Sequence, residues 1–447
     1  LPNNPLKKFI NLITILIFRF ANLMIIPQTL RMLAFCALLQ ITTNVYSQNR
    51  AEAQKVINDL CSDEMAGRGY ISDGDKKAAD YIASKYKSVG LSAWSSDYFQ
   101  EFSLNVNTIT KARLDIDGKL LIPGYDYLVS PASGSVSLNN PIFYVSKKLL
   151  QSSKVHKKVR KAHKKGYTPV ITTFNAKDKT IAENVEMIKK CNQGKTMVFL
   201  KNHLTWSVSR NQVVGAEIWL LDTLFDRYSK RIEVEIEATL RENYTSQNVA
   251  GFVKGTEYPD SVVIFCGHYD HLGQMGDAIF YGANDNASGI SILLDMAAYF
   301  ANNPQKYTIA FIAFGGEEAG LVGSYNYVKS PLIPLTKTKF VFNMDLMGSG
   351  EQGATIVNGS VYKKQFQELV RINDSNGYLP KIKSRGKAAN SDHYFFSEAG
   401  VPSFFIYLMG DYKHYHIPAD NAKNLVLGPY YDKSFQLIRD FIIYLSK

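Results

Sequence analysis

Five short segments of this chain place an acidic or imidazole side chain directly after an apolar, β-rich run. They are residues 266–270, 282–289, 315–318, 343–345 and 414–420. Together they supply the side chains that a hydrolytic metal pair requires, namely a bridging carboxylate and terminal His or carboxylate ligands on each ion. Because ligands of an open α/β sheet bind at the carboxyl ends of its strands, the segments predict one site with two metals.

The residue types within these segments suggest distinct roles. His268 is a suitable metal ligand, and Asp270, two residues on, can accept a hydrogen bond from the other ring nitrogen of His268. Asp285 lies in a turn rich in Gly, Asn and Ser, where the backbone allows its carboxylate to reach both ions. Glu317 and Glu318 are adjacent on an irregular segment, so one can bind metal while the other acts as general base.

Each of these patterns also has a purely structural explanation. A single His-x-Asp is usually a hydrogen bond, a Glu pair is usually solvated, and an Asn-Asp-Asn turn is usually only a turn. Their occurrence together, each at the end of a predicted strand, indicates a functional site. His271, His393 and His414 compete with His416 for the last ligand position. We prefer His416, because a tight loop containing Pro418 follows it, and we interpret His393 as a neighbour behind the ligands.

Strands that alternate with helices position these segments. Buried-strand patterns cover residues 261–266, 307–314, 339–342 and 403–408. Between the first two, one apolar helix face is formed by Ile290, Leu293, Leu294, Ala297 and Ala298. The alternation predicts an α/β fold, a three-layer αβα arrangement with a mostly parallel central sheet.

Length and composition indicate a globular protein with more than one domain. The 447 residues exceed one typical core, and 46% hydrophobic with 20% charged residues excludes a disordered chain. The formal net charge is +11. Residues 147–165 hold nine Lys or Arg and no acid, but few aromatic residues are interleaved with them, as nucleic-acid binding would require. We therefore expect a solvated basic surface and no nucleic-acid partner.

The N-terminal residues 1–47 resemble a signal peptide or an anchor. Arg31 and Met32 precede a short apolar stretch, and Ser47 offers a small residue for cleavage. A second apolar run, residues 9–26, is interrupted by polar residues and is short for a membrane span. The chain begins with Leu, which suggests an over-extended reading frame. We expect an exported protein, periplasmic, extracellular or membrane-anchored facing outward, with membrane contact only if this segment is retained.

Export would leave Cys61, Cys191 and Cys266, an odd number that permits at most one disulfide within the chain. Cys266 falls in a predicted buried strand, where a free thiol acts as a small hydrophobic group. None of the metal-type segments falls within residues 108–240. We therefore expect a catalytic domain built from residues 48–107 and 241–447, with residues 108–240 as an inserted domain beside the cleft.

The motifs resemble those of the co-catalytic two-zinc aminopeptidases, whose relatives include secreted leucine aminopeptidases, glutamate carboxypeptidase, glutaminyl cyclase and the non-catalytic transferrin receptor. The resemblance is loose over residues 50–107 and close over 246–440. It rests on CGHYDHLG (266–273), GANDNASG (282–289), FGGEEAGLVGS (314–324), FNMDLMGSG (342–350), SDHYFFSEAGVP (391–402) and HIPAD (416–420).

The resemblance implies two Zn²⁺ per chain and assigns their ligands. One zinc would be held by His268, Asp285 and Asp345, and the other by Asp285, Glu318 and His416. Glu317 would be the general base, and Asp270 would orient His268. A cis peptide bond would join Asp285 to Asn286. The insertion occupies the place where relatives often carry a protease-associated domain, although this sequence matches that domain poorly.

The function that these residues and the resemblance indicate is that of an exported zinc exopeptidase, an aminopeptidase acting on peptides. A glutaminyl cyclase or a carboxypeptidase on the same fold remains an alternative, because these enzymes share most of the ligands. A non-catalytic, receptor-like protein is a remote alternative, since such a chain would be expected to lack ligands.

Overall fold

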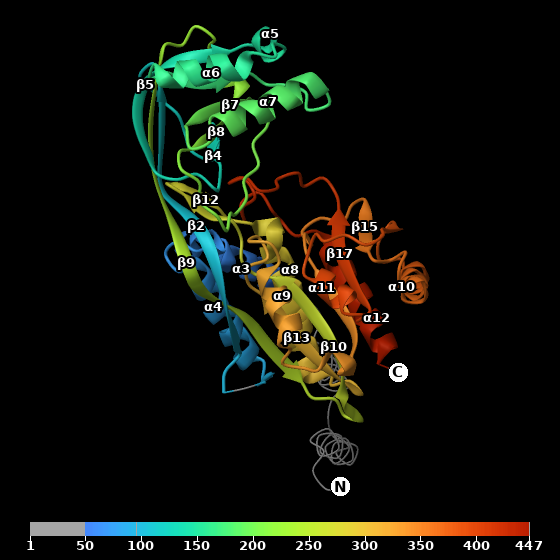
Figure 1. Cartoon of the computed structure of the whole chain (residues 1–447). Coiled ribbons are helices and arrows are strands. Elements are labelled where there is room, and N and C mark those ends of the chain that lie inside the picture. The colour runs from blue at the N-terminus through green and yellow to red at the C-terminus, as the bar shows by residue number, and fades with distance from the viewer. Residues whose placement is uncertain (1–49, 95, 447) are drawn as a thin grey trace, which may run out of the picture. The chain divides into compact units, whose positions relative to one another are not determined.

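The apolar runs predicted as strands assemble into one mixed central sheet (Figure 1). Its strand order is β2 (Phe99–Ile116), β9 (Arg231–Val253), β13 (Tyr307–Phe314), β10 (Tyr258–His268), β14 (Thr338–Met344), β17 (Ser403–Met409), β15 (Gly353–Val357) and β16 (Ile382–Ser384). Strands β13, β10, β14 and β17 are parallel, whereas β9 and β15 run antiparallel to their inner neighbours. The predicted α/β fold is confirmed, with a sheet that is mixed towards both edges.

Helices cover both faces of this sheet. One face buries α3 (Arg50–Leu60), α4 (Gly74–Ser88), α8 (Ser288–Asn302), α10 (Lys363–Asn376) and α12 (Pro429–Leu445). The other face buries α9 (Val322–Lys329) and α11 (His393–Glu398). In β10, Val263 and Phe265 point to the first face, and Ile264 and Cys266 to the second. Because the strand is buried on both sides, its sequence is continuously apolar instead of alternating.

The structure is a computed structural model that describes residues 50–94 and 96–446. The predicted signal peptide or anchor at residues 1–47 lies outside this part of the chain. The described residues belong to one compact unit. Within them, no helix combines the length and the apolar character that crossing a membrane would need. Cys61, Cys191 and Cys266 are all unpaired, and Cys266 is buried in β10 as expected.

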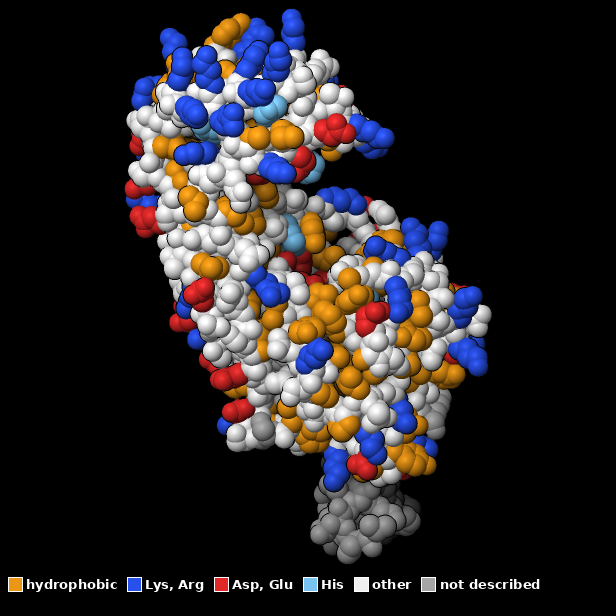
Figure 2. Space-filling model, viewed as in Figure 1, with side chains coloured by type: hydrophobic (Ala, Val, Ile, Leu, Met, Phe, Trp, Pro, Cys, Tyr) orange, Lys and Arg blue, Asp and Glu red, His pale blue; other side chains and the backbone are white. Residues whose placement is uncertain are grey.

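A second, smaller sheet forms a lobe within residues 127–221. Its order is β5 (Val136–Val145), β6 (Thr168–Ile171), β7 (Met197–Lys201), β8 (Glu217–Leu221) and β4 (Tyr127–Val129). Helices α5 (Lys147–Leu150), α6 (Val155–Lys164) and α7 (Lys179–Cys191) accompany it. Helix α6 buries Val155, Val159 and Ala162 and exposes its Lys and Arg side chains, so the basic run is a solvated helix (Figure 2).

Two long strands connect the lobe to the central sheet. β2 and β9 pair along nearly their whole length and extend from the sheet into the lobe (Figure 1). Beyond the sheet, β9 also pairs with β5. The boundaries expected at residues 108 and 240 therefore fall inside strands and not in linkers.

Short elements complete the chain. The strands are β1 (Ser92–Ala93), β3 (Lys119–Leu120), β11 (Gly273–Met275) and β12 (Ala278–Phe280). The short helical segments are η1 (Asp63–Arg68), η2 (Asp222–Leu224), η3 (Ala283–Ala287) and η4 (Leu335–Lys337). The β11–β12 hairpin and η3 lead from the end of β10 to the start of α8, which places the Asp285 turn over the sheet edge.

Candidate metal centre

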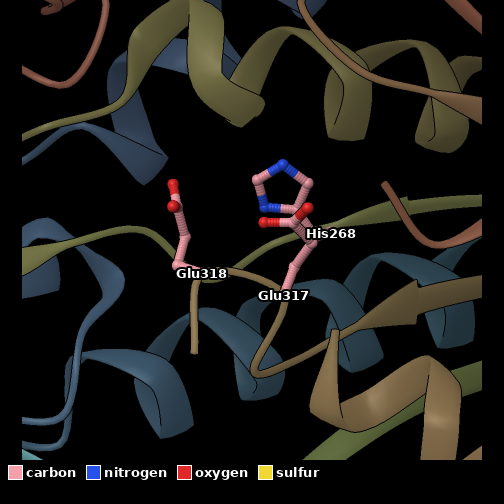
Figure 3. Close-up of side chains that lie close together, drawn as sticks. All are labelled: His268, Glu317 and Glu318. Atoms are coloured by element: carbon pink, nitrogen blue, oxygen red, sulfur yellow. The ribbon is translucent and has the colours of Figure 1, made fainter. Parts of the chain in front are cut away.

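The predicted side chains converge at the carboxyl ends of the parallel strands. His268 ends β10 and pairs in register with Phe314, the last residue of β13, so Glu317 and Glu318 follow at the same level. Asp345 follows β14 directly. Figure 3 shows the two glutamates diverging, with Glu317 beneath the His268 ring and Glu318 to one side. The register of the sheet therefore places side chains that are up to 77 residues apart beside one another.

Asp285 lies between the two predicted histidine ligands. Its Oδ1 is 3.3 Å from Nε2 of His268, and its Oδ2 is 3.1 Å from Nε2 of His416. The Nε2 atom of His268 is also 3.4 Å from Oδ1 of Asp345, and that of His416 is 3.4 Å from Oε2 of Glu318. Each oxygen of one carboxylate thus faces a different imidazole, the arrangement expected of a bridging ligand.

The local chemistry fits a pair of divalent ions. Asp285, Glu317, Glu318 and Asp345 crowd four carboxylates together, and no Lys or Arg among the described residues forms an ion pair with them. Asp345 accepts a hydrogen bond from Ser391 at Oδ2 (3.2 Å), while its buried Oδ1 has no hydrogen-bond partner. The ion-pair partners of these buried carboxylates are imidazoles, and a set of carboxylate oxygen and imidazole donors suits zinc.

Burial and neighbouring charges separate the two glutamates. Burial raises the pKa of Glu317 well above its usual value, and the Glu318 carboxylate raises it further although His268 opposes this. Burial also acts to raise the pKa of Glu318, but the imidazoles of His416 and His271 together outweigh it and lower that pKa to about 2. Burial lowers and Glu318 raises the pKa of His416, which ends at about 11. Protonation is therefore easier at Glu317 than at Glu318.

Asp270 makes a different contact from the one expected. Its carboxylate accepts hydrogen bonds from the backbone N–H groups of Glu317 (3.0 Å) and Glu318 (3.3 Å). The Nδ1 atom of His268 lies 3.9 Å from that carboxylate and 3.1 Å from the Asp270 carbonyl oxygen. The backbone of Asp270 therefore meets the imidazole, and its side chain holds the glutamate loop. Burial raises the pKa of Asp270 to about 7, against the opposing effect of His268.

Two buried residues fix the Asp285 turn, and only one of them lies in a predicted motif. Asp420 accepts hydrogen bonds from the backbone N–H groups of Asn284 (2.8 Å) and Asp285 (3.2 Å). Arg68, fully buried, donates to the carbonyl oxygens of Gly282 (2.8 Å) and Asp285 (3.3 Å). The peptide bond between Asp285 and Asn286 is cis, as the resemblance implied. Sequence reasoning missed Arg68, because the segment around it reads only as a turn.

His416 is held by the lobe. Its Nδ1 is 2.8 Å from the carbonyl oxygen of Trp206, and the backbone N–H of Trp206 donates to the carbonyl oxygen of His416 (3.0 Å). The indole of Trp206 donates to the carbonyl oxygen of Val129 (2.7 Å) and stacks on Phe280 at 4.7 Å between ring centres. A ligand histidine commonly has its second nitrogen fixed in this way. The lobe thus contributes to the centre although it supplies none of the candidate ligands.

The competing histidines lie in three different places. His271 is buried with Nδ1 2.8 Å from Oε1 of Glu318, and it also forms a ligand-sized group with Glu318 and Asp285. His414 lines another cavity and contacts Tyr412. His393 is buried beside Phe405, and burial lowers its pKa to about 4. Of these three, only His271 touches the cluster.

Comparison with known proteins agrees with this geometry. Residues 248–441 match the model of peptidase family M28. Over 439 residues the chain is 25% identical to aminopeptidase YwaD of Bacillus subtilis, covering 94% of this chain and 90% of that protein. It is 37% identical over 114 residues to a probable zinc metalloprotease of Pyrenophora teres f. teres, which is 24% of each protein.

Solved structures share the fold. BSAP, a zinc aminopeptidase from Bacillus subtilis, superimposes with a TM-score of 0.67 at 22% identity and covers 90% of this chain and 96% of its own. An aminopeptidase from Aneurinibacillus sp. strain AM-1 gives 0.60 at 20% identity, with coverage of 90% and 94%. The similarity extends into the lobe as well as the central sheet, because each match covers 90% of this chain.

Proposed function

Because residues 248–441 form a peptidase family M28 domain and the chain is a metallo-exopeptidase, we propose that it is an exported aminopeptidase with two zinc ions, which removes N-terminal residues from peptides. The observation that carries the proposal is the Asp285 carboxylate between His268 and His416, with the Glu317–Glu318 pair beside it. Similarity to an aminopeptidase along nearly the full length supports cleavage at the N-terminal end of the substrate.

Each ion would be held by three side chains. His268, Asp285 and Asp345 would bind one, and Asp285, Glu318 and His416 would bind the other. When bound, zinc lowers the pKa of water and polarises the scissile carbonyl. His271 is better placed as a support for Glu318, because it contacts that carboxylate while the Nδ1 atom of His416 is anchored by the lobe.

The residues of the chain move the proton. Glu317 takes it from the attacking water and delivers it to the nitrogen of the leaving amine. A pKa raised above the usual Glu value favours this role, since an ordinary carboxylate is a weak base at neutral pH. Asp270 positions Glu317 by accepting from its backbone N–H. Without that bond the loop could place the carboxylate out of reach of the water.

A comparison of blocked and free peptides tests the proposal. The purified chain is incubated with one peptide series carrying a free amine, an N-acetyl group or an N-terminal glutamine. We expect sequential loss of N-terminal residues from the free peptides only, abolition by a chelator, and recovery with zinc. Cleavage of acetylated peptides from the carboxyl end would indicate a carboxypeptidase. Cyclisation of the glutamine without peptide cleavage would indicate a glutaminyl cyclase.

Export is proposed from the N-terminal pattern alone. The basic residue, the short apolar stretch and the small residue Ser47 support removal of a signal peptide. The full chain, expressed with its N-terminus in a bacterial host, should be found outside the cytoplasm with a new N-terminus near residue 48. An uncleaved chain in the cytoplasmic fraction would contradict this part of the proposal.

A further inference from the structure

A second cavity lies between the lobe and the metal centre. Its volume is about 630 Å³, and Figure 2 shows the hollow where the lobe meets the rest of the unit. Its walls come from the lobe, including Phe174, Lys201, Trp206 and Trp219, with the single exception of His416. His416 also lines the smaller cavity of about 210 Å³ that contains the candidate ligands. The two cavities therefore meet at a candidate zinc ligand.

The sizes of the two cavities suit an exopeptidase that takes one residue at a time. The smaller cavity is bounded by the ligands, Phe405 and Tyr407, and has room for a single residue. The larger one has three times the volume and is open to solvent, so it can accept the rest of a short peptide. Its walls combine aromatic side chains with the hydroxyls of Thr173, Thr205 and Ser207, which can hydrogen-bond a peptide backbone.

One cation in the lobe cavity has no carboxylate partner. Lys201 is half-buried at the end of β7, and it forms no ion pair within the described part of the chain. Glu217, whose charge acts on Lys201, is engaged by Lys189 (3.0 Å) and by Nε1 of Trp219 (2.7 Å). The Lys201 ammonium instead lies 5.8 Å from the centre of the Trp219 ring. Burial lowers the pKa of Lys201 although the charge of Glu217 acts to raise it, so the ammonium charge is only partly compensated.

An unpaired ammonium in a partly desolvated cavity favours a carboxylate ligand, because a charge-assisted hydrogen bond would compensate its burial. Every peptide has one such group at its far end. We propose that the lobe cavity binds the leaving part of the substrate and that Lys201 binds its C-terminal carboxylate, so the enzyme prefers short peptides with a free carboxyl end. This inference rests on the proposed aminopeptidase function.

The test compares peptides of two to six residues, each as free acid and as C-terminal amide. At the length that reaches Lys201, we expect the acid to have a kcat/KM about 10–100-fold higher than the amide, the usual worth of a hydrogen bond to a charged group. The difference should appear in KM. Lys201→Met should bring the acid-to-amide ratio close to one, and Lys201→Arg should keep part of it. Lys157→Met, on the exposed face of α6, should leave the ratio as in the wild type.

Arg385 is the second cation that could bind a carboxylate, since it lines the smaller cavity. If Arg385→Met abolishes the ratio while Lys201→Met retains it, the inference is wrong and the carboxyl end lies in the smaller cavity. Amidated peptides with an internal Asp form a further arm. A Lys201-dependent preference for that Asp would assign the site to a side chain and overturn the C-terminal assignment.

Binding to the Glu317→Gln variant separates the inference from the proposed function. Calorimetry should show tighter binding of the acid than of the amide at the preferred length, and the difference should vanish with Lys201→Met in the same background. This difference does not require turnover. A wild-type chain that cleaves peptides without any acid preference would overturn the inference alone. A chain that shows the preference in binding but cleaves no peptide would overturn only the proposed function.

Discussion

Glu317 and Glu318 are chemically identical neighbours whose surroundings give them opposite behaviour. Glu318 faces the imidazoles of His271 and His416, which keep it charged, whereas burial and other carboxylates favour the protonated form of Glu317. We therefore expect Glu317→Gln to lower kcat by roughly 10²–10⁴-fold, the usual worth of a positioned base, with zinc content unchanged. Glu318→Gln should instead lose zinc, because an amide is a poorer ligand.

Metal analysis beside kinetics decides between the two roles. If Glu317→Gln loses zinc and Glu318→Gln retains it, the assignments must be exchanged. Full activity in both variants would contradict the metallopeptidase mechanism itself. His271→Asn is a useful companion, because it removes the contact to Oε1 of Glu318 without touching Glu317.

The Asp270 side chain gives a second prediction at this scale. Because it accepts from the N–H groups of both glutamates, Asp270→Asn should disturb the loop more than it disturbs His268. We expect a loss of about 10–100-fold in kcat, as for other residues that position a site, with little change in zinc affinity. The opposite result, a loss of zinc affinity at constant kcat, would restore the role expected from the sequence, orientation of His268.

At the residue scale, sequence reasoning identified the groups that converge, because carboxylates and imidazoles at strand ends are distinctive. It missed two residues whose contacts at the site involve backbone atoms. Arg68 holds carbonyl oxygens, and Trp206 presents one. Any residue type offers a carbonyl oxygen, so the position of Trp206 beside His416 has no signature in the sequence. For the same reason, the sequence does not reveal that the carbonyl oxygen of Asp270, and not its carboxylate, contacts His268.

At the element scale, the contact between the lobe and the His416 loop changes the expected role of the insertion. A separate lobe beside the cleft would be removable without loss of zinc. The paired hydrogen bonds between Trp206 and His416 indicate instead that the lobe holds one candidate ligand in place. Trp206→Ala keeps the carbonyl oxygen but loses the stacking on Phe280 and the hydrogen bond to Val129. The loop that carries His416 should therefore be held less rigidly.

We expect Trp206→Ala to lower the affinity for one zinc ion by about 10–100-fold, the usual effect of losing a residue that supports a metal ligand. Zinc competition with a coloured chelator measures this directly. Trp219→Ala, which alters the lobe cavity without touching His416, is the matched control and should keep both affinities. Unchanged zinc binding in Trp206→Ala would show that the lobe acts only on substrate.

Strand β9 shows why the domain boundaries were hard to place. Residues 232–236 alternate between more and less buried side chains, whereas residues 246–251 are all buried. One face of β9 is therefore buried in the lobe, whereas both of its faces are buried in the central sheet. The division at residue 240 followed the distribution of candidate ligands, which does not report where a strand ends.

At the scale of the whole molecule, the order of strands and helices was predictable, because buried parallel strands and an amphipathic α8 leave clear patterns. The long pairing of β2 with β9 was not, since it depends on contacts between residues 116 to 150 positions apart in sequence. The stability of this unit should depend on pH through Asp295 of α8, which is not one of the candidate ligands. Burial raises the pKa of Asp295 to about 7, although the Tyr431 hydroxyl donates to it (3.3 Å).

The sign follows from proton binding. The folded chain holds the Asp295 proton more tightly than the unfolded chain, whose Asp pKa is about 3.9. The resulting stabilisation is complete below about pH 4 and is lost as the pH rises through about 7. Asp295→Asn cannot ionise, so its stability relative to wild type should increase from pH 4 to pH 8, by up to about 4 kcal/mol. Melting temperatures measure this, with the exposed Asp80→Asn as a control that should follow the wild type.

Metal removal should affect the whole unit, because the candidate ligands lie at or after the ends of β10, β13, β14 and β17 and in the turn before α8. Without ions, four neighbouring carboxylates repel one another across these elements. We expect a chelator to lower the melting temperature and zinc to restore it. When the free zinc concentration is a thousand times the dissociation constant, each bound ion should stabilise the folded chain by about 4 kcal/mol. The titration should end at two ions per chain, and at one for His416→Ala. An end point of one ion in the wild type would contradict the bridging role of Asp285 and favour a single-zinc cyclase.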